Sequence, residues 1–152
     1  MPTWLITGCS TGLGRSLAQE VVAAGHQAVV TARDPAAVAD LAGPAPDRVL
    51  PLALDVTDPG QVTEAVRRAE ERFGGVDVLV NNAGYGYRAA VEEGGDEDVR
   101  ALFETNFFGA VAMIKAVLPG MRSRRSGTIV NISSIGAQIT PCLLYTSPSP
   151  RD

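Results

Sequence analysis

The sequence predicts an α/β fold, in which a parallel sheet is covered by helices on both faces. Short apolar runs alternate along the chain with segments whose apolar residues recur at helical spacing, and glycines or polar residues separate the two. Because parallel strands need crossover connections, this alternation is typical of a parallel sheet. The 152 residues, 45% of them hydrophobic, are enough to bury one core, which predicts one domain.

Five apolar runs are the predicted strands, and four segments between them are the predicted helices. We expect the strands at residues 4–7, 27–31, 49–54, 76–80 and 128–132. We expect the helices at residues 13–24, 35–41, 59–73 and 96–121. The third helix has the clearest ends, because Asp58 can cap its start and Gly74-Gly75 can stop it.

Composition excludes several classes of function. A net charge of −4, with Lys115 the single lysine, argues against a nucleic-acid surface. Cys9 and Cys142 make no disulfide framework, no Cys/His group has metal-ligand spacing, and His26 is expected at a helix end rather than in catalysis. The N-terminus lacks a signal peptide and no apolar run is long enough to span a bilayer, so we expect a cytoplasmic protein without a metal or membrane partner.

A glycine-rich turn joins the first predicted strand to the first predicted helix. It reads Thr7-Gly8-Cys9-Ser10-Thr11-Gly12-Leu13-Gly14. Glycines let a pyrophosphate approach the backbone N–H groups of a helix N-terminus, which carry partial positive charge. The spacing Gly8-x-x-x-Gly12-x-Gly14 differs from the Gly-x-Gly-x-x-Gly of the commonest dinucleotide folds. Taken alone, the motif fits a phosphate site and a bare structural turn equally well.

Four motifs in order along the chain resemble those of the short-chain dehydrogenase/reductase family. They are the glycine-rich turn, Asp55 after the third strand, Asn81-Asn82-Ala83-Gly84 after the fourth, and Asn131-Ile132-Ser133-Ser134 at the fifth. The resemblance covers residue 3 to about residue 140. It implies a Rossmann-type, doubly wound parallel sheet and hydride transfer between a nicotinamide and an alcohol or carbonyl. Residues 82–86 and 116–119 further resemble members similar to retinol or 17-beta-hydroxysteroid dehydrogenases.

The end of the second predicted strand indicates which nicotinamide cofactor is bound. An NAD enzyme places a carboxylate there for the ribose hydroxyls, and that carboxylate would repel a 2′-phosphate. This chain has Ala32 at the position, followed by Arg33, whose guanidinium suits a phosphate and can stack on adenine. We therefore expect NADP rather than NAD. The alternative is that Arg33 is a solvated surface arginine beside Asp34.

The resemblance assigns the other cofactor contacts residue by residue. Ser10 and Thr11 would offer hydroxyl and N–H groups to phosphate, or would cap the helix instead. Asp55 would accept a hydrogen bond from the adenine amino group, with Val56 contributing backbone, or would itself be a cap. Asn81 is expected to join neighbouring strands. The cofactor-binding residues expected in this way are Gly8, Ser10, Thr11, Gly12, Leu13, Gly14, Arg33, Asp55, Val56, Asn82, Ala83 and Gly84.

The resemblance also implies two residues that act on the substrate. Asn106, expected as a buried amide on the long helix, matches the asparagine that holds a water in the family's proton relay, and an internal hydrogen bond is the alternative. Ser134 matches the serine that polarises the substrate oxygen, and Ser133 would point to the opposite face if the strand persists. The family's Tyr-x-x-x-Lys pair is absent from the sequence, so the chain is predicted to be inactive as it stands.

The composition changes after Pro141. Residues 142–152 contain two prolines, follow no helical period and resemble the translation of a sequencing adapter. We therefore expect an incomplete domain at residues 1–141, truncated after the fifth strand, followed by a foreign or disordered tail. The resemblance implies a longer, homo-oligomeric parent acting on a small-molecule alcohol or carbonyl. The alternative function is a non-catalytic NAD(P)-binding module or redox-sensing regulator.

Overall fold

A five-stranded parallel sheet forms the centre of the molecule. The structure, a computed structural model, describes residues 1–90 and 92–134. The strands are β1 (Thr3–Ile6), β2 (Gln27–Ala32), β3 (Val49–Ala53), β4 (Val78–Asn81) and β5 (Thr128–Asn131), in the order β3-β2-β1-β4-β5. The predicted doubly wound sheet is therefore confirmed. The tail expected at residues 142–152 lies outside the described residues.

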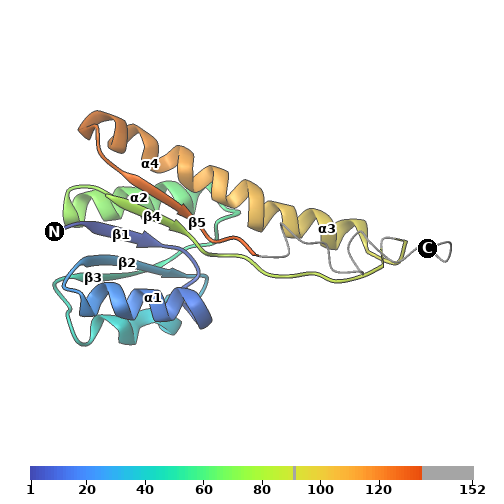
Figure 1. Ribbon diagram of the computed structural model, residues 1–152, viewed down its shortest axis with the longest axis horizontal. Coiled ribbons are helices and arrows are strands. Elements are labelled where there is room, and N and C mark those ends of the chain that lie inside the picture. The colour runs from blue at the N-terminus through green and yellow to red at the C-terminus, as the bar shows by residue number, and fades with distance from the viewer. Residues whose placement is uncertain (91, 135–152) are drawn as a thin grey trace.

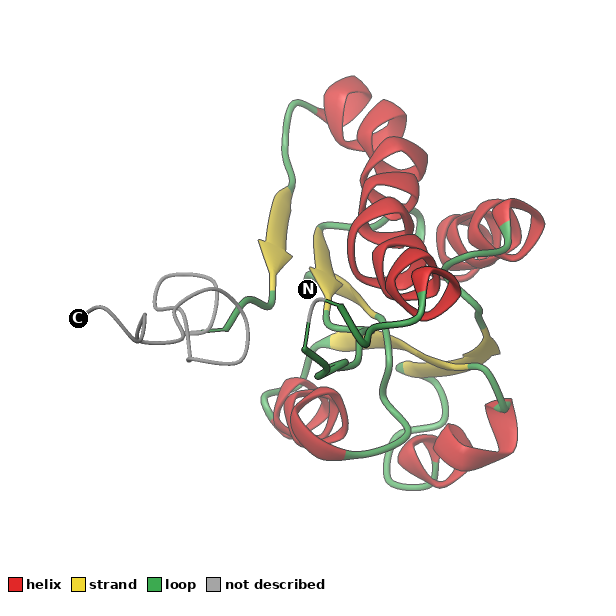
Figure 2. Cartoon of the chain, turned by 90° about the vertical axis from the view of Figure 1, so that its right-hand side faces the viewer, coloured by secondary structure: helices red, strands yellow, loops and turns green. Residues whose placement is uncertain are grey.

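Helices lie on both faces of the sheet, as Figures 1 and 2 show. They are α1 (Gly12–Ala23), the 3-10 helix η1 (Pro35–Ala42), α2 (Pro59–Phe73), α3 (Asp96–Phe103), the π-helix η2 (Glu104–Gly109) and α4 (Ala110–Arg124). The predicted helix at 59–73 has the observed bounds. The one predicted at 96–121 is continuous but contains the π-helical turns of η2.

Neighbouring residues of each central strand enter different cores. Leu5 of β1 packs in the core beneath α2 and α4, and Ile6 packs in the core beneath α1 and η1. Both side chains are fully buried, and burying one of this size contributes about 1.5–3 kcal/mol. Because both faces of such a strand are buried, apolar residues follow one another along it.

The helical region from α3 to α4 corrects one expectation from the sequence. Asp96–Arg124 spans 29 residues, and an 18-residue window within it has a mean hydropathy of 1.4, so by length and composition alone this helix could cross a membrane. It was missed because Glu104 and Lys115 interrupt its apolar residues. A single helix of this kind is weak evidence for a membrane span, since core helices of soluble proteins have the same length and composition.

Candidate functional site

A cleft lies at the carboxyl ends of the strands, where the chain leaves the adjacent strands β1 and β4. Crevices at this point of a doubly wound sheet bind ligands. The cleft has a volume of about 660 Å³, within the range of small-molecule sites. It is lined by every predicted cofactor-binding residue except Gly12, and also by Ala32, Leu54, Thr57, Tyr85 and Thr105.

Hydrogen bonds from Thr7 and Asn82 fasten the glycine-rich turn to the loop after β4. The Thr7 hydroxyl accepts from the backbone N–H groups of Asn82 (3.0 Å) and Ala83 (2.9 Å) and donates to the Val80 carbonyl (3.3 Å). The Asn82 amide nitrogen donates to the carbonyls of Thr7 (2.8 Å) and Gly8 (3.0 Å). These carbonyls would repel an anion, and the amide neutralises them. This role of Thr7 could not be predicted from the sequence, because it depends on a contact with a distant loop.

Two glycines of the turn are required by its geometry. Gly8 has a φ of 71°, in the left-handed region, and a Cβ there would lie 2.9 Å from the Ala83 Cα. A Cβ on Gly14 would lie 2.3 Å from the Asn82 Nδ2 and 2.4 Å from the Gly8 carbonyl oxygen. The turn therefore passes too close to the loop after β4 for any side chain at these positions. Gly12, which does not line the cleft, has a φ of 57° where α1 begins.

The start of α1 has no side-chain cap. Thr11 is its N-cap residue but makes no side-chain capping bond, whereas Asp34 and Asp58 cap η1 and α2. The alternative role of Thr11 as a hydrogen-bonding cap is therefore not supported. The first backbone N–H groups of α1 are available to an anion in the cleft.

Cys9 lies in the same turn but is packed inward. Its side chain is fully buried, and its Sγ donates to the Ile6 carbonyl at 3.2 Å. Burial raises the pKa of the thiol to about 11, so the sulfur stays protonated at neutral pH. Cys9 therefore acts as a core residue and not as a nucleophile.

Arg33 is exposed at the edge of the cleft, directly after β2. Its neighbour Asp34 accepts from the Ala36 N–H at 2.9 Å and caps η1. Within residues 1–90 and 92–134, no carboxylate forms an ion pair with Arg33. The strand end thus presents an unpaired guanidinium to the cleft.

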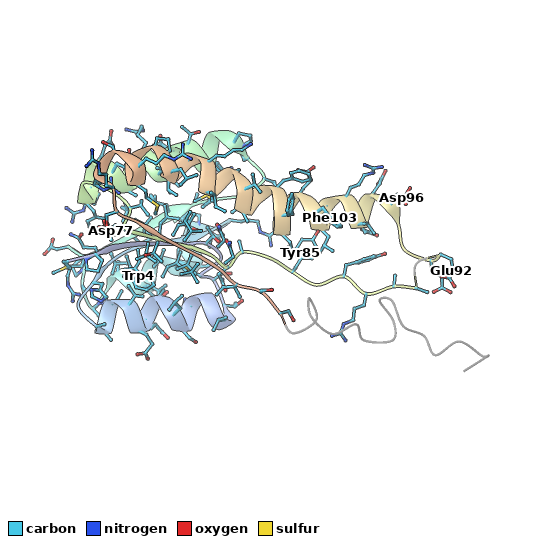
Figure 3. All side chains as sticks on the ribbon, turned by 45° about the horizontal axis from the view of Figure 1, so that its top comes forward. Trp4, Asp77, Tyr85, Glu92, Asp96 and Phe103 are labelled. Atoms are coloured by element: carbon cyan, nitrogen blue, oxygen red, sulfur yellow. The ribbon has the colours of Figure 1, made fainter. Side chains whose placement is uncertain are left out.

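Asn106 is exposed, so the expected buried amide is wrong. The reason is that α3 and η2 project beyond the strands, as Figure 1 shows, and no strand of the described residues covers them. The Asn106 Oδ1 accepts from the Tyr85 N–H at 3.1 Å, and its Nδ2 donates to the Tyr85 carbonyl at 2.8 Å. Figure 3 shows Tyr85 on the extended segment that follows β4, beside the helix that carries Phe103. The internal hydrogen bond considered for Asn106 is present, and the side chain holds this segment in place.

The end of β5 differs from the expected alternation. The strand stops at Asn131, so its alternation does not extend to Ser133 and Ser134. Ser134 is exposed and, in the described part of the chain, is not among the cleft-lining residues. The Asn81 Nδ2 donates to the Asn131 Oδ1 at 2.8 Å, which confirms that Asn81 joins neighbouring strands.

The sequence is similar to those of several known proteins. The family model for short chain dehydrogenase matches residues 2–145. Oxidoreductase BOA17 of Botryotinia fuckeliana is 44% identical over 137 residues, which cover 90% of this chain and 50% of that protein. A 3-ketodihydrosphingosine reductase of Bacteroides thetaiotaomicron is 45% identical over 132 residues, covering 87% of this chain and 46% of the relative.

Solved structures show the same likeness. A short-chain dehydrogenase from Streptomyces avermitilis superposes with a TM-score of 0.90 at 43% identity, covering 95% of this chain and 54% of the other. A gluconate 5-dehydrogenase from Burkholderia cenocepacia, in complex with NADP and tartrate, gives 0.86 at 32% identity, covering 95% and 58%. The chain spans about half the length of the relatives it matches. From its motifs, its sheet order and these matches, the chain belongs to the short-chain dehydrogenase family.

Proposed function

We propose that this chain is the cofactor-binding part of an NADP-dependent oxidoreductase that interconverts an alcohol and a carbonyl. The observation that carries the proposal is the guanidinium of Arg33 at the cleft, which forms no ion pair with a described residue, together with Ala32 in place of a carboxylate. A ribose 2′-phosphate is doubly charged near neutral pH and would find its partner there. The gluconate 5-dehydrogenase structure, which contains NADP, supports the same cofactor.

The residues that line the cleft support the binding of a dinucleotide. Gly8 and Gly14 have no room for side chains, and the uncapped start of α1 offers N–H groups to a pyrophosphate. Asp55 and Val56 would hold the adenine, and residues 82–84 would lie along the ribose and nicotinamide. When bound, the nicotinamide supplies the site that donates or accepts hydride. Asn106 would hold a relay water and Ser134 the substrate oxygen, as the family resemblance implies.

Titration of the 152-residue chain with NADPH and with NADH tests the cofactor. We expect NADPH to bind about tenfold or more tightly, because a charge-assisted bond to phosphate contributes roughly 1.5–3 kcal/mol. Arg33→Ala should remove this preference, and Ala32→Asp with Arg33→Ala should reverse it. Arg68→Ala, which removes an exposed arginine of α2, is the matched control. Tighter binding of NADH by the unmutated chain would contradict the proposal.

The chain as it stands is proposed to bind the cofactor without turning over substrate. A phenol with a pKa near 10 needs an adjacent cation to act at neutral pH. The sequence contains no Tyr-x-x-x-Lys, and its single lysine, Lys115, is exposed on α4. The alternative is a non-catalytic NAD(P)-binding module or redox-sensing regulator, and the presence of Asn106 and Ser134 favours the enzyme for the parent protein. We expect no NADPH oxidation with carbonyl substrates under conditions in which binding is saturated, and measurable turnover would contradict this.

The partners of the parent protein follow from the same proposal. Its substrate would be a small-molecule alcohol or carbonyl, and the full-length parent is expected to be a cytoplasmic homo-oligomer. The resemblance to the family supports the substrate class and the homo-oligomeric state.

A further inference from the structure

The loop after β3 carries Asp55, which uses one carboxylate oxygen for hydrogen bonds within the loop. The Asp55 Oδ1 accepts from the Thr57 hydroxyl at 2.7 Å and from the Thr57 backbone N–H at 2.9 Å. This is an Asx turn and not the helix cap considered for Asp55, because Asp58 caps α2. Within residues 1–90 and 92–134, the Asp55 Oδ2 has no hydrogen-bond partner. Asp55 is half-buried and lines the cleft.

The backbone that carries Asp55 is fixed from two sides. The Gln61 Oε1 accepts from the Asp55 N–H at 2.8 Å, and the Gln61 Nε2 donates to the Asp58 Oδ2 at 3.1 Å. Val56 is 6% exposed, and a Cβ on Gly109 of η2 would lie 2.5 Å from its Cγ2, so the loop packs tightly against the helix. With the backbone held, only the side-chain torsions of Asp55 could still vary. The two hydrogen bonds from Thr57 fix these torsions.

The next residue supplies a donor beside this acceptor. In the described part of the chain, the Val56 N–H forms no hydrogen bond, and Val56 lines the same cleft. A free carboxylate oxygen followed by a free N–H matches the edge of adenine, where the 6-amino group donates and N1 accepts. The edge of a 6-keto purine has the opposite order, since its oxygen accepts and its N1–H donates.

We propose that Thr57 is a positioning residue for recognition of the cofactor's base. By occupying the Asp55 Oδ1 twice, it leaves Oδ2 as the single acceptor beside the Val56 N–H and makes the site selective for a 6-amino purine over a 6-keto purine. The inference rests on the proposed function, because it concerns the adenine end of the same cleft.

The test compares NADPH with its hypoxanthine analogue, in which a keto oxygen replaces the 6-amino group. Calorimetric titration of the 152-residue chain should show tighter binding of NADPH. Asp55→Asn keeps an oxygen for Thr57 and puts an NH₂ group in place of Oδ2, so it should shift the ratio of affinities toward the analogue by about tenfold. Thr57→Val should weaken NADPH binding by roughly three- to tenfold and change analogue binding less. Thr57→Ser keeps both donors and should restore the selectivity.

Thr63→Val is the matched control for folding. Thr63 is also exposed and donates its hydroxyl to a backbone carbonyl, that of Pro59 at 2.9 Å, but it does not contact Asp55. Its binding ratio should equal that of the unmutated chain. If Thr57→Val does not fold, Thr57→Ala, which also removes the hydroxyl and keeps the backbone N–H, takes its place in the same comparison of affinity ratios.

The possible failures of the two proposals are distinct. No binding of NADPH by the unmutated chain would overturn the proposed function and this inference together. Binding of NADPH with an unchanged ratio in Asp55→Asn, or an equal loss of both cofactors in Thr57→Val, would overturn this inference alone.

Discussion

At the scale of single residues, the site depends on close contacts between the glycine-rich turn and the loop after β4. The Asn82 side chain lies against Gly14 and donates to two carbonyls of the glycine-rich turn. Neither the amide nor the turn can move away without breaking these bonds. Gly14 is therefore required for close packing, in addition to any contact it makes with a phosphate.

Gly14→Ala should destabilise the fold by about 1–3 kcal/mol, as expected for overpacking of a tight site. Denaturant unfolding of the variant measures this loss. Gly86→Ala is the matched control, because a Cβ at Gly86 would meet no atom within 4 Å. Equal stability of the two variants would show that the contact with Asn82 is not restrictive.

At the scale of elements, the ends of α2 were predictable because their signals are local. The Asp58 carboxylate accepts from the Gly60 N–H at 2.8 Å and the Gln61 N–H at 3.1 Å, and Gly74 ends the helix with a φ of 85°. The π-helical turns of η2 were not predictable. The residues of η2 follow an ordinary helical pattern, and contacts distant in sequence accompany the change, Gly109 against Val56 and Asn106 on Tyr85.

The predicted and the missed parts of the site differ in the same way. Local signals could be recognised in the sequence, and contacts between distant residues could not. Gly8, Asp55 and Asn82 could be placed because each follows a recognisable strand, and parallel strands bring their carboxyl ends to one edge. The exposure of Asn106 could not be predicted, because it depends on how far the helix extends past the sheet. The bonds of Thr7 to the β4 loop also depend on tertiary structure.

Asp58→Ala should lower the melting temperature at neutral pH and have little effect in strong acid. The bonds from Gln61 and Gly60 lower the pKa of the Asp58 carboxyl below its usual value of 3.8. The folded state thus favours the charged form, so its stabilisation is complete above that value and is lost as the pH falls through the lowered pKa. Thermal unfolding of both proteins from pH 7 to pH 2 would show their melting temperatures converge. Asp47→Ala removes a fully exposed carboxylate 4.0 Å from the Arg72 guanidinium, a pair that contributes little, so its melting temperature should stay close to that of the unmutated chain at every pH.

At the scale of the whole molecule, the sheet is well covered near α1 and α2 but apolar side chains stand exposed on the projecting helix. Phe103, Phe107 and Phe108 are 54%, 55% and 52% exposed. A cluster of aromatic side chains in water is a driving force for association. These three exposed side chains therefore favour self-association of the chain.

We expect the isolated chain to associate as its concentration rises. Phe103→Ser with Phe108→Ser should reduce this association, because these two side chains line one groove of the exposed face. Light scattering after size-exclusion chromatography measures it. Ile132→Ser, which removes a side chain 41% exposed after β5, is the control. A monomer at all concentrations would contradict the expectation.

The hydroxyl of Thr7 has a consequence for the order in which the molecule assembles. It bonds to backbone atoms 75 and 76 positions later, so the nucleotide cradle cannot exist before β1 and β4 have paired. Such distant pairing is a slow event, since a long loop must close first. A nucleotide that binds only the finished cradle therefore adds its binding energy to the cohesion of both halves of the sheet, and its presence should delay their separation on heating.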